Sequence, residues 1–129
     1  MKYMLLIYGE EQILSDAERQ DCYGKSAQLC QELSVQGKYI AASPLQSVAT
    51  ATSVRMRDNR RLITDGPFAE TREQLGGYFM VDAKDLDEAI SIASRIPAAQ
   101  WGTVEIRPVV ELGEMLPEQN ALAGAESRH

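Results

Sequence analysis

Two strand–helix–strand patterns on either side of a hairpin pattern leave this chain few possible folds. In residues 52–63, apolar and charged side chains alternate with period two, which predicts a β-hairpin. An apolar run at residues 1–9, a helix pattern and a short extended run precede it. A strand pattern at 77–82, a second helix pattern and a strand pattern at 103–109 follow. This order predicts an α+β fold, a ferredoxin-like β-α-β-β-α-β sandwich with an added hairpin and both helices on one face of the sheet.

Both predicted helices carry start and stop signals. Ser15 and Glu18 have the spacing of a capping box, so the first helix should start there, and Gly37 should end it in a left-handed cap. Asp85 should start the second helix and Pro97 should stop it. The first helix presents one modestly apolar stripe to the core, made of Cys22, Ser26, Leu29, Cys30 and Leu33.

The length of the chain indicates how many domains it forms, and its net charge indicates which partners it can bind. The 129 residues suit one domain, which we expect at 1–112, followed by a poorly ordered C-terminal tail at 113–129. A net charge of -6 opposes attraction to phosphate backbones, so no nucleic acid partner is expected. The apolar runs are too short for a membrane span or a secretion signal. We therefore expect a cytoplasmic protein with no membrane partner.

The cysteines and the histidine exclude several chemistries. Cys22 and Cys30 lie eight residues apart in one predicted helix, roughly 12 Å along its axis, and cannot form a disulfide there. We expect two buried thiols in a reducing compartment. The single histidine is the last residue, His129, which disfavours Ser-His-Asp, Cys-His and His-ligated metal sites. No metal is expected, and without a phosphate loop or dinucleotide fingerprint no organic cofactor is expected either.

The strand at 77–82 has apolar side chains on both of its faces. Two helices can cover only one face of the sheet, so the other would be a sizeable exposed apolar patch. Self-association covers such a patch, and a two-fold dimer is the commonest closed assembly. The expected partner is therefore a second copy of the chain, bound through the sheet face.

The candidate functional site is the bend at residues 63–73. It joins two strand patterns and carries four ionisable side chains: Asp65, Glu70, Arg72 and Glu73. Asp65 is the candidate catalytic residue, because partial burial raises the pKa of a carboxyl group toward working pH and suits it to general acid/base chemistry. The alternative is that Asp65 opens a turn by hydrogen-bonding its own backbone. The two roles are compatible.

Further residues are candidates for binding a substrate. Arg55 and Arg72 could clamp a carboxylate or phosphate; alternatively Arg72 pairs with Glu70 or Glu73, and Arg55 belongs to the exposed face of the hairpin. Gly76 and Gly77, with Tyr78 as a polar group beside them, could form the base of a pocket, or mark a bulge or a dimer contact. Glu105, which shares one face of the last predicted strand with Arg107, is either a functional carboxylate or part of a cross-strand salt bridge.

The residue strings at 54–57, 64–78, 85–89 and 104–108 strongly resemble the YCII-related proteins of the DGPF subgroup. The resemblance implies a dimeric α+β barrel, a bacterial cytoplasmic protein and a cleft for a small ligand. Members are often encoded near extracytoplasmic-function sigma factors. In the wider family a His-Asp pair has been proposed as catalytic; this chain matches the acidic half at Asp65 and has no internal histidine.

Two functions follow from these observations. The first is a small enzyme-like protein in which Asp65, supported by Arg72 and Tyr78, moves a proton on a small polar or anionic substrate. The second is a non-catalytic ligand-binding or regulatory partner, linked to transcription control, that uses the same cleft without turnover. The sequence leaves both open, and with them the question of whether the protein is an enzyme.

Overall fold

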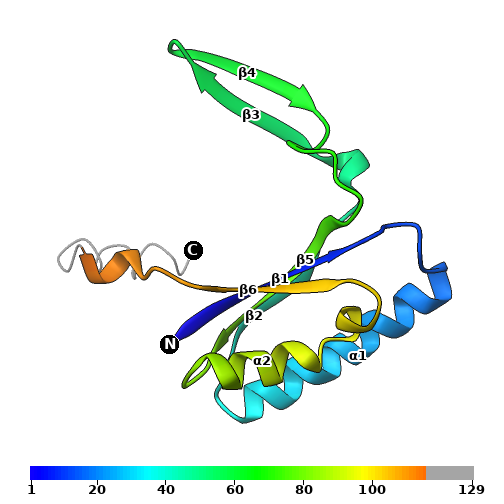
Figure 1. The fold of residues 1–129 in the computed structure, drawn as a ribbon, viewed down its shortest axis with the longest axis vertical. Helices are drawn as coiled ribbons and strands as arrows, with labels where there is room; N and C mark the ends of the chain where they lie inside the picture. The colour runs from blue at the N-terminus through cyan, green and yellow to red at the C-terminus, as the bar shows by residue number, and fades with distance from the viewer. Residues whose placement is uncertain (116–129) are drawn as a thin grey trace.

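The computed structural model describes residues 1–115 of the chain, and its elements follow the predicted order. Figure 1 shows both long helices on one face of the main sheet and the β3–β4 hairpin extending away from it. The strands are β1 (Lys2–Gly9), β2 (Tyr39–Pro44), β3 (Thr52–Arg57), β4 (Arg60–Asp65), β5 (Gln74–Asp82) and β6 (Thr103–Pro108). The helices are α1 (Asp16–Val35) and α2 (Leu86–Ser94), with the 3-10 turns η1 (Val48–Thr50), η2 (Pro97–Gln100) and η3 (Leu112–Met115).

The main sheet has four antiparallel strands in the order β2-β5-β1-β6. Counted without the hairpin strands, this is the strand order of the ferredoxin-like fold, so the predicted fold class is confirmed. The β3 and β4 strands form a separate two-stranded sheet. Of the expected tail, residues 113–115 belong to η3, and the rest of it lies outside the described residues. No helix among the described residues is long and apolar enough to cross a membrane.

The predicted caps of α1 are confirmed. The Ser15 hydroxyl accepts the Glu18 backbone N–H at 3.1 Å, and the Glu18 carboxylate accepts the Ser15 N–H at 2.9 Å. At the other end, Gly37 has φ +73° and the Lys38 N–H donates to the Leu33 carbonyl at 2.8 Å. These bonds satisfy backbone groups that a helix leaves unpaired at its ends, so the helix limits are set locally.

The second helix and the hairpin turn also follow local signals. The Asp85 carboxylate accepts the Glu88 N–H at 2.9 Å and caps α2, which ends just before Pro97. Asp58 and Asn59 connect β3 to β4 with φ of +51° and +61°, the left-handed pair that a tight hairpin turn requires. The core lies between the helices and the sheet, and its largest fully buried side chains are Leu5, Leu33, Val81 and Ile96.

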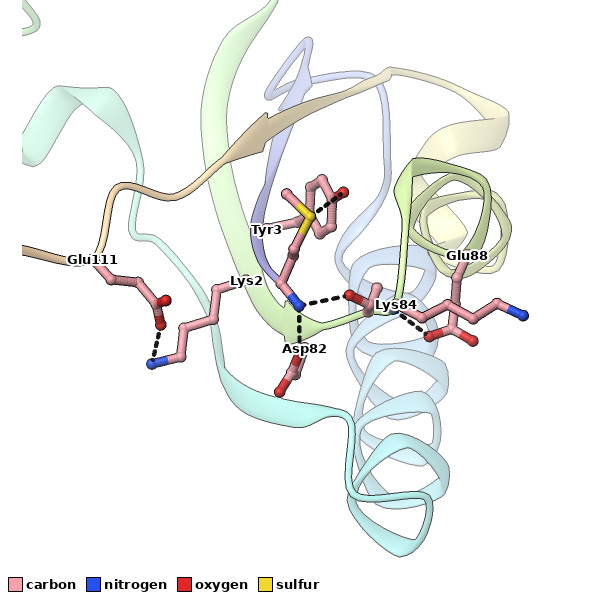
Figure 2. Close-up of polar contacts among 8 residues, drawn as sticks. Lys2, Tyr3, Asp82, Lys84, Glu88 and Glu111 are labelled. Carbon is pink, nitrogen blue, oxygen red and sulfur yellow. Dashed lines mark hydrogen bonds and ion pairs between the residues drawn. The ribbon is translucent and has the colours of Figure 1, made fainter. Parts of the chain in front are cut away.

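The N-terminus is held to the end of β5, as Figure 2 shows. The Met1 ammonium group donates to the Asp82 carboxylate at 3.0 Å and to the Ala83 carbonyl at 2.9 Å. Lys2 forms an ion pair with Glu111 at 2.8 Å. These contacts join the start of β1 to the segments that follow β5 and β6, so the central strand β1 is tied to both of its neighbours.

A candidate ligand pocket between α1 and the sheet

A pocket of about 680 Å³ lies between the N-terminal half of α1 and the ends of β1, β2 and β5. This volume is in the usual range for small-molecule sites. Its apolar lining includes Ile7, Leu14, Ala27, Ala42, Phe79 and Ile96. Its polar lining includes Glu10, Glu11, Arg19, Ser26, Gln74 and Trp101. The pocket is therefore an apolar space with polar groups at a few positions of its wall.

The small side chains of α1 leave this space open. Leu29 and Leu33, in the C-terminal half of the predicted stripe, are buried in the core. Cys22, Ser26 and Cys30 line the pocket instead, because they are too short to fill the distance to the sheet. The expectation of two buried thiols was therefore wrong: both cysteines are free and half-buried. Partial burial raises the pKa of the Cys30 thiol.

Hydrogen bonds of Glu11 close one side of the pocket. The two carboxylate oxygens of Glu11, in the β1–α1 loop, accept the Ser47 hydroxyl and the Val48 N–H, each at 2.9 Å. Arg19 on α1 donates to the Glu11 carbonyl at 2.9 Å. Through Glu11, the loop after β1 is joined both to the segment after β2 and to α1. The wall of the pocket is thus built from three separate parts of the chain.

Trp101 contributes a buried donor to the pocket wall. Its ring packs against Gly9 so closely that a Cβ at that position would collide with the ring. The indole Nε1 is buried and has no hydrogen-bond partner among the described residues. An unpaired buried donor costs free energy, and an acceptor oxygen on a bound molecule would offset that cost. Trp101 was not among the predicted site residues. A ligand cleft with Gly76, Gly77 and Tyr78 was predicted, but the contribution of α1 to it was not; the small residues Cys22, Ser26 and Cys30 on the inward face of α1 were the available signal.

The predicted glycine pair lies at the pocket. Ile7 faces Gly77 and Tyr8 faces Leu75, so Gly76 is the extra residue of a β-bulge. A Cβ at Gly77 would lie 3.1 Å from the Ser43 carbonyl oxygen, so β2 approaches this position closely. Both the bulge and the close approach were predicted. Gly76, Gly77 and Tyr78 all line the pocket, and their part in ligand binding stays a prediction.

Arg72 reaches the pocket through a partner that the sequence did not indicate. Its Nε donates to the Glu10 carboxylate at 2.5 Å, and Glu10 lines the pocket. The sequence favoured Glu70 or Glu73 as partners of Arg72. The fold instead brings the bend after β4 against the loop after β1, so Arg72 is exposed and touches the pocket wall only through Glu10.

Besides Arg72, which touches the pocket only through Glu10, three more predicted site residues lie outside the pocket wall. Asp65 is exposed at the end of β4, in register with Thr52. Arg55 is also on the hairpin, with its guanidinium carbon 4.8 Å from the centre of the Phe68 ring. Glu105 is exposed on β6, where it accepts the Tyr8 hydroxyl at 3.5 Å. The structure therefore groups Arg72, through Glu10, with the residues of β5 and separates these three from them; their functional roles stay predictions.

No metal site accompanies the pocket in the part of the chain described. Within residues 1–115, no group of three or more His, Cys, Asp or Glu side chains is placed to hold a metal ion. The groups able to do chemistry at the pocket are the carboxylates of Glu10 and Glu11, the thiols of Cys22 and Cys30, and the Tyr23 hydroxyl. The carboxylates can accept protons or hydrogen bonds from a bound molecule, and the thiols and the hydroxyl can donate hydrogen bonds to it.

Comparison with known proteins places the chain in a family. The YCII-related domain matches residues 1–113. The chain belongs to the YCII-related family. The uncharacterized protein R00369 of Rhizobium meliloti (strain 1021) is similar, at 34% identity over 118 residues, which cover 84% of this chain and 92% of that protein.

A solved structure shares the fold of this YCII-related chain. It is 5-chloro-2-hydroxyhydroquinone dehydrochlorinase (TftG) from Burkholderia phenoliruptrix AC1100, in complex with 2,5-dihydroxybenzoquinone. The TM-score is 0.54 with 13% sequence identity, and the match covers 86% of this chain and 95% of TftG. At this identity the likeness shows the α+β fold alone.

Proposed function

We propose that this protein binds a small molecule in the pocket between α1 and the sheet. The observation that carries the proposal is the pocket itself, with its volume of about 680 Å³ and its largely apolar lining. A pocket of this size holds one small organic molecule, and an apolar wall favours an apolar body. The ligand should therefore have a compact apolar body with few polar substituents.

The polar groups of the pocket wall restrict the chemical class of the ligand further. Trp101 lines the pocket and its indole N–H has no partner among the described residues, which makes it a candidate donor to a ligand oxygen, such as a carbonyl or a phenolic oxygen. The Tyr23 hydroxyl and the thiols of Cys22 and Cys30 can serve other polar substituents. An oxygenated six-membered ring combines a flat apolar body with acceptor oxygens. TftG, which shares the fold, is named for a reaction on a hydroxylated hydroquinone and was solved with such a ring, and this supports the same class here.

We further propose that a carboxylate at the pocket transfers a proton to or from the bound ligand. Glu10 and Glu11 line the pocket, whereas Asp65 does not. Glu11 already accepts two hydrogen bonds from the segment after β2, so it serves to position the loop. Glu10 is held by Arg72 at the rim and is the better candidate for general acid/base chemistry. The non-catalytic alternative, a ligand-binding regulator linked to transcription control, uses the same pocket without turnover.

Binding of 2,5-dihydroxybenzoquinone, catechol and benzoate, measured by calorimetry, tests the proposal. Ser26→Phe fills the pocket from α1, and Ser34→Phe places the same ring on the exposed side of the same helix. We expect at least one probe to bind the wild type, with a loss of about tenfold or more in Ser26→Phe, corresponding to about 1.4 kcal/mol, and no change in Ser34→Phe. Failure of all three probes would overturn the ligand class. Equal affinity in Ser26→Phe and wild type would overturn the location.

The single tryptophan offers an independent measurement. The chain contains one Trp, so one indole N–H resonance is expected in a nitrogen-correlated NMR spectrum. A ligand oxygen that accepts this N–H should shift the resonance downfield. A ligand that binds in the pocket and leaves the resonance in place would show that Trp101 takes no part in recognition.

A further inference from the structure

The β3–β4 hairpin, residues 52–65, forms an arm on which no other helix or strand of residues 1–115 packs. Its two strands pair with each other and form a sheet separate from the main one. They make no extensive contact with any other described helix or strand. Figure 1 shows the arm projecting well beyond the main sheet and the helices. A lone two-stranded hairpin is at best marginally stable in water, so an arm of this length calls for a surface to pack on.

One face of the arm is apolar. Residues paired directly across the two strands share a face, which places Val54 with Ile63 and Met56 with Arg61. Val54, Met56 and Ile63 are exposed to 59%, 58% and 56%. Such an apolar group with a polar border is typical of an interaction surface. Asp65, at the base of the arm, alternates onto this same face.

The opposite face of the arm is basic. Arg55 pairs with Leu62 and Arg57 with Arg60 across the strands. The arm carries four arginines against two aspartates, in a chain whose net charge is -6. The remainder of the chain is therefore strongly acidic. A second copy of the same chain offers the arm an oppositely charged surface, and charge complementarity steers association and suppresses wrong partners.

The main sheet offers an apolar surface of its own. Tyr3 and Leu5 of β1 point to the helices and are buried, so the alternating Met4 and Leu6 point to the other face. In β5, Tyr78 and Met80 alternate in the same way with buried Phe79 and Val81. Neither long helix covers this second face (Figure 1). A second copy can bring this apolar surface and acidic charge to the arm, whereas the other described helices and strands of its own chain do not pack on it.

We infer that the arm is an intersubunit clasp, in which the apolar face of each β3–β4 hairpin packs on the second copy of a homodimer. The contact is reciprocal, because a two-fold axis places the arm of each subunit on the other. Val54, Met56 and Ile63 become buried in this contact. The arginines of the other face remain in water or pair with acidic groups of the second copy. The bend that carries Asp65 then lies at the subunit boundary.

Intermolecular NMR contacts in a mixed sample test this inference. Isotope-labelled and unlabelled full-length chains are mixed, and isotope-filtered spectra report only contacts between copies. We expect contacts from the methyl groups of Val54 and Ile63 to protons of the unlabelled chain. A monomer in solution would overturn the inference. So would a dimer whose intermolecular contacts leave out the arm, because it would show association through the sheet alone.

A matched pair of variants tests the choice of face. Val54→Asp places a charge on the apolar face, and Leu62→Asp places the same charge on the opposite face of the arm. Sedimentation of the two variants should show a dimer weakened by about tenfold or more in Val54→Asp and little changed in Leu62→Asp. Equal effects, or none in either variant, would overturn the assignment of the apolar face to the contact.

Discussion

Glu11 and Val48 lie 37 residues apart in the sequence, yet the Glu11 carboxylate accepts the Val48 backbone N–H at 2.9 Å. The bond joins the loop that leads into α1 to the segment that leads out of β2. Both segments line or border the pocket, so its shape depends on a contact between two connections rather than on the sheet alone. Loops held in this way carry function on a rigid scaffold.

Removal of the Glu11 carboxylate should loosen these loops. Glu11→Ala leaves the Ser47 hydroxyl and the Val48 N–H without their acceptor, and we expect a destabilisation of about 1–3 kcal/mol. The free energy of unfolding in urea measures it, and hydrogen exchange at residues 45–50 should speed up. Glu70→Ala, which removes an exposed carboxylate from another loop, is the control. Equal free energies of unfolding for the two variants would show that the Glu11 hydrogen bonds do not stabilise the fold.

Gly77 and Gly24 should respond to alanine in opposite directions. A Cβ at Gly77 would lie 3.1 Å from the Ser43 carbonyl and 3.3 Å from the Pro44 Cα, both backbone atoms, so Gly77→Ala should destabilise by about 1–3 kcal/mol. Gly24 lies within α1 with open space around it, so Gly24→Ala should stabilise by about 0.5–1 kcal/mol. Thermal unfolding compares the two. A neutral Gly77→Ala would show that β2 can move away.

Glu88 should contribute to acid unfolding. Hydrogen bonding to the Lys84 N–H and to Lys38 lowers the pKa of Glu88 below its ordinary value of 4.5. Because the folded-state pKa is lower than the unfolded one, the ionised group stabilises the fold above about pH 4.5. This stability is lost as the pH falls through the folded-state pKa. Glu88→Gln should therefore lose less stability on acidification than wild type, whereas Asp87→Asn should follow the wild-type profile.

Cys30 should alkylate slowly in the native protein. Burial raises the pKa of its thiol, which lowers the fraction of reactive thiolate at neutral pH. Iodoacetamide followed by peptide mass spectrometry measures the rate, which should rise when urea unfolds the chain. A ligand in the pocket should slow the reaction of Cys30 further, since Cys30 lines it. If a bound probe slows the alkylation of neither Cys30 nor Cys22, the probe binds outside the pocket.

Asp65 and Arg72 should differ in their effect on ligand affinity. Asp65 lies outside the pocket wall, so Asp65→Asn should bind a pocket ligand as wild type does. Arg72→Ala removes the partner of Glu10 at the rim; because an exposed ion pair contributes at most about 1 kcal/mol, we expect affinity to fall by up to about fivefold. Calorimetry with the same probe compares them. A large loss of ligand affinity in Asp65→Asn would show that the ligand binds at the bend after β4.

Local sequence signals predicted the elements well. Ser15 with Glu18, Asp85 with Glu88, and the left-handed Asp58-Asn59 turn all act over a few residues, so their geometry can be read from spacing. The strand order follows because two strand–helix–strand units with both helices on one face have few ways to form one sheet. The YCII-related part of the family resemblance agrees with the match over residues 1–113, and the DGPF subgroup stays a prediction.

The pocket could not be derived in the same way. It lies where short side chains of α1 face the sheet across a gap, and a gap is set by the distance between elements rather than by any one of them. Arg72 illustrates the difficulty, because its partner Glu10 is distant in sequence while Glu70 and Glu73 are near. Trp101 is similar, since its unpaired N–H becomes apparent only when the surrounding groups are in place.

Residue order alone thus determined where both helices begin, which way the hairpin turns and which fold joins the elements, because the caps and the turn depend on bonds between near neighbours. It did not determine every strand limit, since β5 begins at Gln74 and not at Gly77 as predicted. Tertiary structure decided that Asp65 stands apart from the pocket, that Glu11 closes one side of it, and that no other described helix or strand packs on the hairpin. The physical reason is that cavities and unpartnered surfaces arise from how distant side chains fill, or fail to fill, the space between elements.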